Sequence, residues 1–282
     1  MGPEESRDPR LQREGLEERI DLKTLLAKHG LRPDKRFGQH FLVSQRVVRS
    51  IVDRVSDIAG VLEVGPGPGV LTRPMTDLGI QVVAVELDKF VLPLLLEFAP
   101  RAKVVEGDAL TSDLESLLRA LPEPRAIVSN MPYNITGPLL DAFTNLRGLV
   151  TKLVLMMQRE VAEKILAPPG DSARGALSVV MQAHFVVSKV CQAPPGAFLP
   201  PPKVESTVLQ FVPARTDLSA DRIDAVIDVV RAGFTQPRKT VYNNLTTLLG
   251  RETADQRLTL AKVEHRMRPH QLTWEQWTKL SS

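Results

Sequence analysis

The feature that most constrains the fold is a short apolar segment that runs directly into a glycine-rich turn. The apolar segment Val61–Val64 is followed by glycines at 65, 67 and 69, which alternate with prolines at 66 and 68. A strand, a glycine-rich turn and then a helix is the arrangement in which doubly wound α/β sheets bind nucleotide cofactors. The sequence therefore predicts a Rossmann-like α/β domain.

The prolines of this turn indicate which cofactor it accepts. Pro66 and Pro68 have no backbone N–H, so the turn is a poor cradle for a pyrophosphate. The turn also lacks the Lys-Ser/Thr pair of an NTPase P-loop, and Val70 stands where a dinucleotide-binding motif has its third glycine. A cofactor with a positive sulfonium and no phosphate fits better. We predict S-adenosylmethionine, with Gly65 and Gly67 allowing close approach of its methionine part.

The next two predicted strands end in acids suited to the rest of this cofactor. Gln81–Val85 leads into Glu86, about 20 residues after the first glycine, where an acid accepts the ribose hydroxyls. Lys103–Glu106 leads through Gly107 to Asp108 and Ala109. Asp108 can accept the adenine amino group and Ala109 can offer its backbone N–H. Taken singly, an acid that ends a strand by chance remains the alternative.

A fourth strand, Ala126–Ser129, delivers the tetrapeptide Asn130-Met131-Pro132-Tyr133. Pro132 stiffens this loop and holds Met131 extended. Asn130 and the Pro132 carbonyl can accept hydrogen bonds from an exocyclic amine, while Tyr133 stacks on the ring of a planar base. The alternative is an ordinary turn.

The proline-rich loop 194–204 carries Phe198, which we predict to be the second face of a clamp on that base. A hydrophobic plug under the loop is the alternative for Phe198.

Along the chain, the patterns predict a charged, flexible leader at 1–20, the Rossmann-like domain at 21–213 and a small helical domain at 214–282. Arg238 and Lys239 start a helix of the last segment and suit contact with an RNA backbone. Further strands are expected at 152–157, 185–191 and 206–212. Helices are expected after Asp21, after an N-cap at Ser44, and at 159–165, 175–180, 223–230, 241–249 and 270–280.

The composition limits the kinds of partner that the protein can bind. The net charge of +3 and pI near 9.1 permit nucleic-acid binding, with basic residues gathered near 32–36 and 231–239. Cys191 is the only cysteine, which excludes an internal disulfide and a thiolate zinc site and fits a reducing cytoplasm. The histidines lack metal-ligand spacing, so no metal is expected. No apolar run approaches the roughly 20 residues of a membrane span, and the N-terminus lacks a signal-peptide pattern, so no membrane partner is expected.

With these residues identified, the chain resembles the KsgA-type ribosomal RNA adenine dimethyltransferases from about Lys23 to its end. The segment 38–42, which contains Gln39, His40 and Leu42, is similar to the family's cofactor-gripping motif, and 63–69 to its glycine loop. Glu86, Asp108 and Ala109 fall at the ribose and adenine positions. The motif 130–133 matches the catalytic motif, with Met131 where Leu or Ile is commoner. Two further segments match the family, Phe198–Val204 and Arg238-Lys239-Thr240. Pro237 stands where a basic residue is common in the family.

This resemblance implies a methyltransferase that dimethylates N6 of two adjacent adenosines near the 3′ end of small-subunit (16S) rRNA. The partner it implies is that rRNA within a pre-30S or 30S particle, and we expect a monomer in the cytoplasm. The resemblance assigns catalysis to Asn130, Pro132, Tyr133 and Phe198. The residues that it assigns to cofactor binding are Gln39, His40, Leu42, Gly65, Gly67, Glu86, Asp108, Ala109 and Asn130.

Three alternative functions remain. A macrolide-resistance-type methyltransferase would share the motifs and act on large-subunit RNA; the Phe198 loop and residues 238–240 favour the small-subunit type. A non-catalytic assembly factor would have no reason to keep Asn130, Tyr133 and the cofactor residues. An NAD-dependent dehydrogenase is disfavoured by Pro66 and Pro68.

Overall fold

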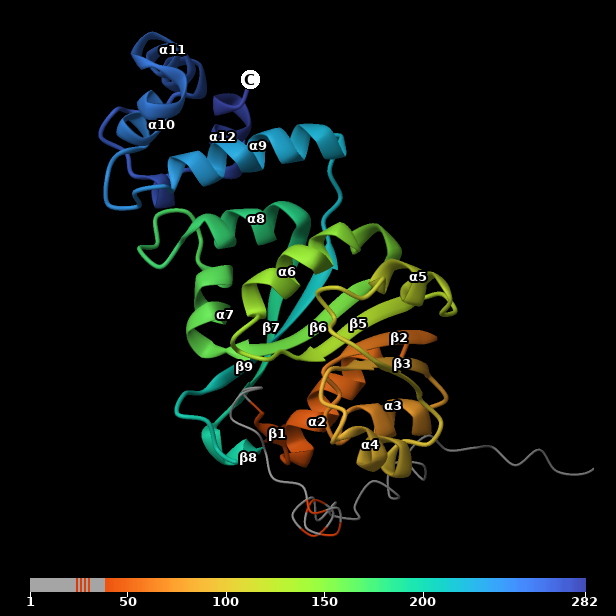
Figure 1. The fold of residues 1–282 in the computed structure, drawn as a ribbon. Helices are drawn as coiled ribbons and strands as arrows, with labels where there is room; N and C mark the ends of the chain where they lie inside the picture. The colour runs from red at the N-terminus through yellow and green to blue at the C-terminus, as the bar shows by residue number, and fades with distance from the viewer. Residues whose placement is uncertain (1–23, 25, 27, 29, 31–38) are drawn as a thin grey trace, which may run out of the picture. The chain divides into compact units, whose positions relative to one another are not determined.

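The structure is a computed structural model that describes Thr24, Leu26, Lys28, Gly30 and Gln39–Ser282 (Figure 1). The predicted leader, the Asp21 cap, the basic residues near 32–36 and Gly38 of the family motif lie outside these residues. Of the helix predicted after Asp21, the structure describes Thr24, Leu26 and Lys28, and all three are helical.

The chain divides into two compact units. The first comprises the described residues up to Asn134 together with Ala193–Lys203, and the second comprises Ile135–Gln192 and Val204–Ser282. The domain boundary predicted at residue 213 stays a prediction.

The first unit is built on four parallel strands in the order β4-β3-β2-β5. Every residue of β2 is buried, because a parallel strand in the middle of an α/β sheet is covered on both faces. A separate antiparallel pair joins β1 to β8. The strands are β1 (Phe41–Leu42), β2 (Gly60–Val64), β3 (Gln81–Glu86), β4 (Lys103–Glu106), β5 (Arg125–Asn130) and β8 (Phe198–Leu199); the helices are α2 (Gln45–Val52), α3 (Thr72–Asp77), α4 (Leu92–Phe98) and α5 (Leu114–Arg119), with short 3-10 turns η3 (Asp53–Val55) and η5 (Pro195–Ala197).

The second unit contains three strands in the order β6-β9-β7, with β6 and β9 antiparallel. Two helices of this unit are tied through side chains: Ser178 Oγ and Gln182 Nε2 of α8 donate to the last carbonyls of α7, at Lys164 and Ile165. The elements are β6 (Lys152–Gln158), β7 (Phe185–Ala193), β9 (Ser206–Pro213), α6 (Thr136–Asn145), η4 (Arg147–Leu149), α7 (Arg159–Leu166) and α8 (Ala176–His184).

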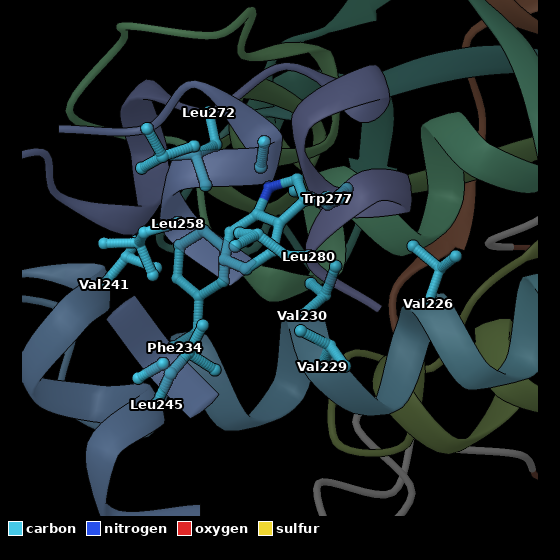
Figure 2. Packing of buried hydrophobic residues seen from close by; sticks show 14 residues of the cluster. Val226, Val229, Val230, Phe234, Val241, Leu245, Leu258, Leu272, Trp277 and Leu280 are labelled. Atoms are coloured by element: carbon cyan, nitrogen blue, oxygen red, sulfur yellow. The ribbon is translucent and has the colours of Figure 1, made fainter. Parts of the chain in front are cut away.

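As predicted, only helices follow Pro213: α9 (Ala220–Gly233), α10 (Val241–Leu249), α11 (Arg251–Ala261), η6 (Pro269–Gln271) and α12 (Trp274–Leu280). They enclose a core centred on Trp277, which stacks on Phe234 with ring centroids 5.8 Å apart (Figure 2). Val179 of α8 belongs to the same core, so this helical region and α8 share one packed cluster.

The seven predicted strands are confirmed, with ends that differ by a residue or two. Helix α11 was not predicted: its buried residues are only Ala254, Leu258 and Ala261, most of its remaining positions are polar, and no apolar stripe marks it. Ser44 occupies the predicted N-cap position with extended backbone, but its hydroxyl makes no capping hydrogen bond. Of the helices in the described part, none is long and apolar enough to cross a membrane.

Candidate active site

The candidate site lies at the carboxyl ends of the four parallel strands of the first unit. From β2 the chain moves outward to β3 and β4 on one side, whereas β5 lies on the other side, so the strand order reverses between β2 and β5. Such a reversal opens a crevice where α/β sheets bind ligands. Here it brings the end of β2 beside the end of β5: Val64 is in register with Ser129, and Ser129 Oγ donates to the Val64 carbonyl at 2.7 Å.

The glycine loop after β2 fits against two of its neighbours. Gly65 and Gly67 both have positive φ, at 68° and 54°, which side-chain-bearing residues rarely adopt. A Cβ on Gly67 would lie 3.2 Å from the Phe41 ring, and one on Gly65 would lie 3.8 Å from Pro132 Cδ. The loop therefore passes close to both β1 and the 130–133 loop.

Glu86, at the end of β3, ties its own strand to this loop. Its Oε2 accepts from Gly67 N–H and its Oε1 from Asp88 N–H, both at 2.9 Å. The side chain is 7% exposed. Burial raises the pKa of Glu86, and the two backbone hydrogen bonds oppose that rise.

Asp108 and Ala109 follow β4 as predicted. Asp108 is half-buried, and its Oδ1 accepts from Leu110 N–H at 2.9 Å. Within the described part of the chain, Asp108 Oδ2 and the Ala109 N–H have no hydrogen-bond partner. An acceptor and a donor therefore stand next to one another at this strand end.

The segment Gln39–Ser44, which we call the strap, contacts the glycine loop, Asp88, the 130–133 loop and β8. Gln39 Nε2 donates to Asp88 Oδ2 at 2.6 Å, and Phe41 packs against the glycine loop. Leu42 is in register with Phe198 across the β1–β8 pair. The strap thus brings segments together that are far apart in the sequence.

Asn130 and Tyr133 both meet the strap at His40. Asn130 Nδ2 donates to the His40 carbonyl at 3.2 Å, and the Tyr133 ring stacks on the His40 ring with centroids 5.8 Å apart. Among the described residues Asn130 Oδ1 has no partner. The amide is therefore oriented with its oxygen available to accept a hydrogen bond.

The structure places the remaining predicted residues as follows. Phe198 is only 3% exposed, so stacking on a base would require its ring to become accessible, and its role in a clamp stays a prediction. Arg238 and Lys239 are exposed in the turn before α10 of the second unit, and in the described part neither side chain is paired with an acid.

Two buried acids at the site were not predicted from the sequence. Asp88, 6% exposed, accepts from Gln39 and from Phe90 N–H. Glu63, 1% exposed, accepts from the Thr72 hydroxyl at 2.6 Å. Burial raises the pKa of Glu63 to about 8, the Thr72 hydrogen bond lowers it, and the charge of Glu86 adds to the rise. An acid inside an apolar strand was the available signal for Glu63.

The chain matches the family model described as Ribosomal RNA adenine dimethylase over residues 30–282. It is 44% identical over 234 residues to a Ribosomal RNA small subunit methyltransferase A from Phenylobacterium zucineum (strain HLK1). The aligned region covers 81% of each chain. A protein of the same name from Prochlorococcus marinus (strain AS9601) is 36% identical over 88% of this chain and 94% of its own.

The chain belongs to the ribosomal RNA adenine dimethylase family. Two solved structures are similar to it: a dimethyladenosine transferase from Plasmodium falciparum (TM-score 0.68, 25% identity, 86% of this chain and 96% of that one) and the 23S rRNA methyltransferase ErmE (TM-score 0.66, 26% identity, 86% and 98%). Like other members, this adenine dimethylase is an S-adenosylmethionine-dependent methyltransferase with a Rossmann-like sheet.

The residues of this dimethylase fit that cofactor. In the glycine loop a Cβ would be crowded at Gly67 and Gly69, and the prolines at 66 and 68 remove two N–H groups that a pyrophosphate would need. Glu86, Asp88 and Asp108 lie at the ends of β3 and β4, so the site favours a cation over an anion. A sulfonium cofactor without a phosphate matches both properties.

Proposed function

We propose that this dimethylase transfers methyl groups to N6 of two adjacent adenosines near the 3′ end of small-subunit rRNA. The observation that carries the proposal is the orientation of Asn130. Its amide nitrogen is bound to the His40 carbonyl, and its amide oxygen has no partner in the described part, at the point where the strand order reverses. The small-subunit target is supported by the names of the relatives that align with most of this chain.

The chemistry requires the N6 lone pair of adenine to be directed at a methyl group. The bound cofactor supplies an electrophilic methyl on a sulfonium. Asn130 Oδ1 and the Pro132 carbonyl accept the two N6 hydrogens, which favours a pyramidal nitrogen whose lone pair points away from the ring. Polar acceptors placed in advance also stabilise the positive charge that develops on nitrogen.

The remaining residues bind the cofactor and the RNA and orient the target base. Tyr133 stacks on the adenine once the base has left its helix stack. Glu86 accepts from the ribose hydroxyls, and Asp108 and Ala109 pair with the edge of the cofactor's adenine. Gln39, Leu42 and the backbone of His40 close the cofactor site from the strap, and Arg238 and Lys239 contact the RNA backbone.

We propose further that the substrate is the rRNA within a pre-30S or 30S particle and that the enzyme acts as a cytoplasmic monomer. A single active site can modify two adjacent adenosines in turn without a second subunit. No metal is required, because the leaving group of the transfer is a neutral thioether and N6, which is acidic once methylated, gives one proton to water.

The test is transfer of labelled methyl groups to unmethylated small subunits and, in parallel, to free large-subunit RNA, followed by digestion to nucleosides. We expect N6,N6-dimethyladenosine from the small subunits only. Label in large-subunit RNA alone would instead establish the alternative function, a methyltransferase of the macrolide-resistance type. Cofactor binding without label in either RNA would indicate an assembly factor.

A further inference from the structure

His40 sits where three segments of the first unit meet, and its ring and its backbone make different contacts. Its carbonyl accepts from Asn130 Nδ2 at 3.2 Å. Its ring Nδ1 lies 2.8 Å from the Pro200 carbonyl, and its ring stacks on Tyr133 at an interplanar angle of 26°. Because a carbonyl oxygen only accepts, Nδ1 carries the proton of this hydrogen bond.

The strap is anchored on both sides of His40 by contacts that do not involve the histidine ring. Gln39 is bound to Asp88, and the N–H groups of Val43 and Ser44 both donate to the Ala197 carbonyl, at 2.8 and 3.3 Å. The path of the strap backbone is therefore fixed independently. The His40 ring is held between two groups, the Pro200 carbonyl and the Tyr133 ring.

We infer that His40 is a positioning residue for the target base: its ring sets the plane of Tyr133 and fixes the Tyr133 loop relative to the loop that carries Phe198. The inference rests on the proposed function, in which Tyr133 stacks on the adenine. Without the His40 ring, Tyr133 loses one of the contacts that hold the plane of its ring, so a smaller fraction of the bound bases is aligned with the methyl group. Displacements of about 1 Å in such alignment can cost about 100-fold in rate.

This role differs from the cofactor-binding role that the family resemblance assigns to His40. A cofactor-binding side chain should change the affinity for S-adenosylmethionine when it is replaced. A positioning side chain should change the rate of methyl transfer on the bound substrate and leave that affinity almost unaltered.

Two substitutions separate the contacts of the ring. His40→Phe keeps a flat ring against Tyr133 but cannot donate to the Pro200 carbonyl. His40→Asn keeps a donor near the position of Nδ1 but removes the stack. Both leave the backbone carbonyl that binds Asn130 in place, and His40→Ala removes both ring contacts.

The first readout needs no substrate. The chain has two tyrosines, so incorporation of 3-fluorotyrosine gives two fluorine NMR signals, and Tyr133→Phe assigns them. We expect His40→Ala and His40→Asn to shift the Tyr133 signal and leave that of Tyr242. Tyr242 offers a matched control, since it stacks on His265 with centroids 4.3 Å apart, and His265→Ala should shift only its signal.

The second readout is the single-turnover rate of methyl transfer to unmethylated small subunits, with cofactor affinity measured by calorimetry. We expect the rate to fall about 100-fold in His40→Ala and to recover partly in His40→Phe and His40→Asn, with cofactor Kd changed less than about twofold. An unshifted Tyr133 signal in His40→Ala, an unchanged rate, or a Kd that rises as much as the rate falls would overturn the inference. Failure of the wild-type enzyme to methylate small subunits would overturn the proposed function instead, and the NMR comparison would still decide whether His40 sets Tyr133.

Discussion

Asn130 is the residue on which methyl transfer should depend most directly, because its amide oxygen is the proposed acceptor for N6. Its nitrogen is already bound to the His40 carbonyl, so a substrate amine can meet only the oxygen. We predict that Asn130→Ala lowers the rate of methyl transfer by about 100-fold or more, the typical cost of removing one such polar group. Cofactor affinity should change much less. Rate measurement beside calorimetry checks this, and an equal loss of both would contradict the assigned role.

Glu86 should show the reverse pattern. Its carboxylate accepts hydrogen bonds from the Gly67 and Asp88 N–H groups and is the proposed acceptor for the ribose hydroxyls. Loss of hydrogen bonds to a charged group predicts that Glu86→Ala weakens S-adenosylmethionine binding by about 10- to 100-fold. Calorimetric titration measures the change, with Glu97→Ala as a control acid exposed at the surface. An unaltered Kd would refute the assignment of Glu86.

Glu63 predicts a particular dependence of stability on pH. Its folded pKa of about 8 lies above the ordinary 4.5, so the folded chain keeps a proton that the unfolded chain releases between these values. Wild-type stability should therefore fall as pH rises from about 4.5 to 8, with this group contributing at most about 1.4 kcal/mol per pH unit.

Glu63→Gln cannot ionise and still offers an oxygen to Thr72. Its free energy of unfolding relative to wild type should thus increase between pH 5 and 8, as measured by urea unfolding at several pH values. A difference that is independent of pH would show that Glu63 ionises normally in the fold.

The contacts of single residues were the part of the site that could be predicted least from the sequence. The carboxyl ends of these four strands were predicted to within one residue, because a glycine, an acid or an amide lies at or directly after each end. The hydrogen bonds from Gln39 to Asp88 and from Asn130 to His40 join residues 49 and 90 positions apart, respectively. No local pattern encodes such pairs.

At the scale of elements, the contact of α9 with α12 depends on the absence of a side chain at Gly233. A Cβ there would lie 2.5 Å from Trp277 Cη2, and Trp277 is fully buried (Figure 2). Alanine is normally the better helix residue by about 0.5–1 kcal/mol. Overpacking, which costs about 1–3 kcal/mol, should nevertheless dominate in Gly233→Ala.

Gly137 of α6 supplies the matched control, since a Cβ there meets nothing within 4 Å. Gly137→Ala should be neutral or slightly stabilising in the same chemical unfolding experiment, whereas Gly233→Ala should unfold at lower denaturant concentration. Equal stability of the two variants would mean that Trp277 moves aside without cost.

Whole elements were predictable to the extent that burial leaves a pattern. Strands such as β2 and β6 are nearly continuous apolar runs because both of their faces are covered. By contrast, β1 and β8 are two residues each and exist only because they pair with one another across the chain. The polar helix α11 has three buried positions, too few to give a period.

At the scale of the whole molecule, RNA affinity should depend on Arg238 and Lys239. Both are exposed and, within the described part, unpaired, so binding a phosphate breaks no existing ion pair. Replacing both with alanine should weaken binding to small subunits and reduce the slope of log affinity against log salt by about 2.

The control pair for this experiment is Arg119→Ala with Lys164→Ala. This control removes the same formal charge, one arginine and one lysine. The two side chains differ from Arg238 and Lys239 in that they are already paired with acids, Glu115 and Glu160. Filter binding at several salt concentrations gives both slopes. An equal reduction in the two double variants would show that total charge, rather than this turn, governs binding.

The most direct measurement is mass analysis of the 3′-terminal fragment of small-subunit rRNA after reaction with the full chain and S-adenosylmethionine. We predict two adjacent N6,N6-dimethyladenosines on that fragment with wild type, and none with Asn130→Ala under the same conditions. Methylation at any other position, or an Asn130→Ala enzyme that modifies the fragment at the wild-type rate, would contradict the proposed reaction at this site.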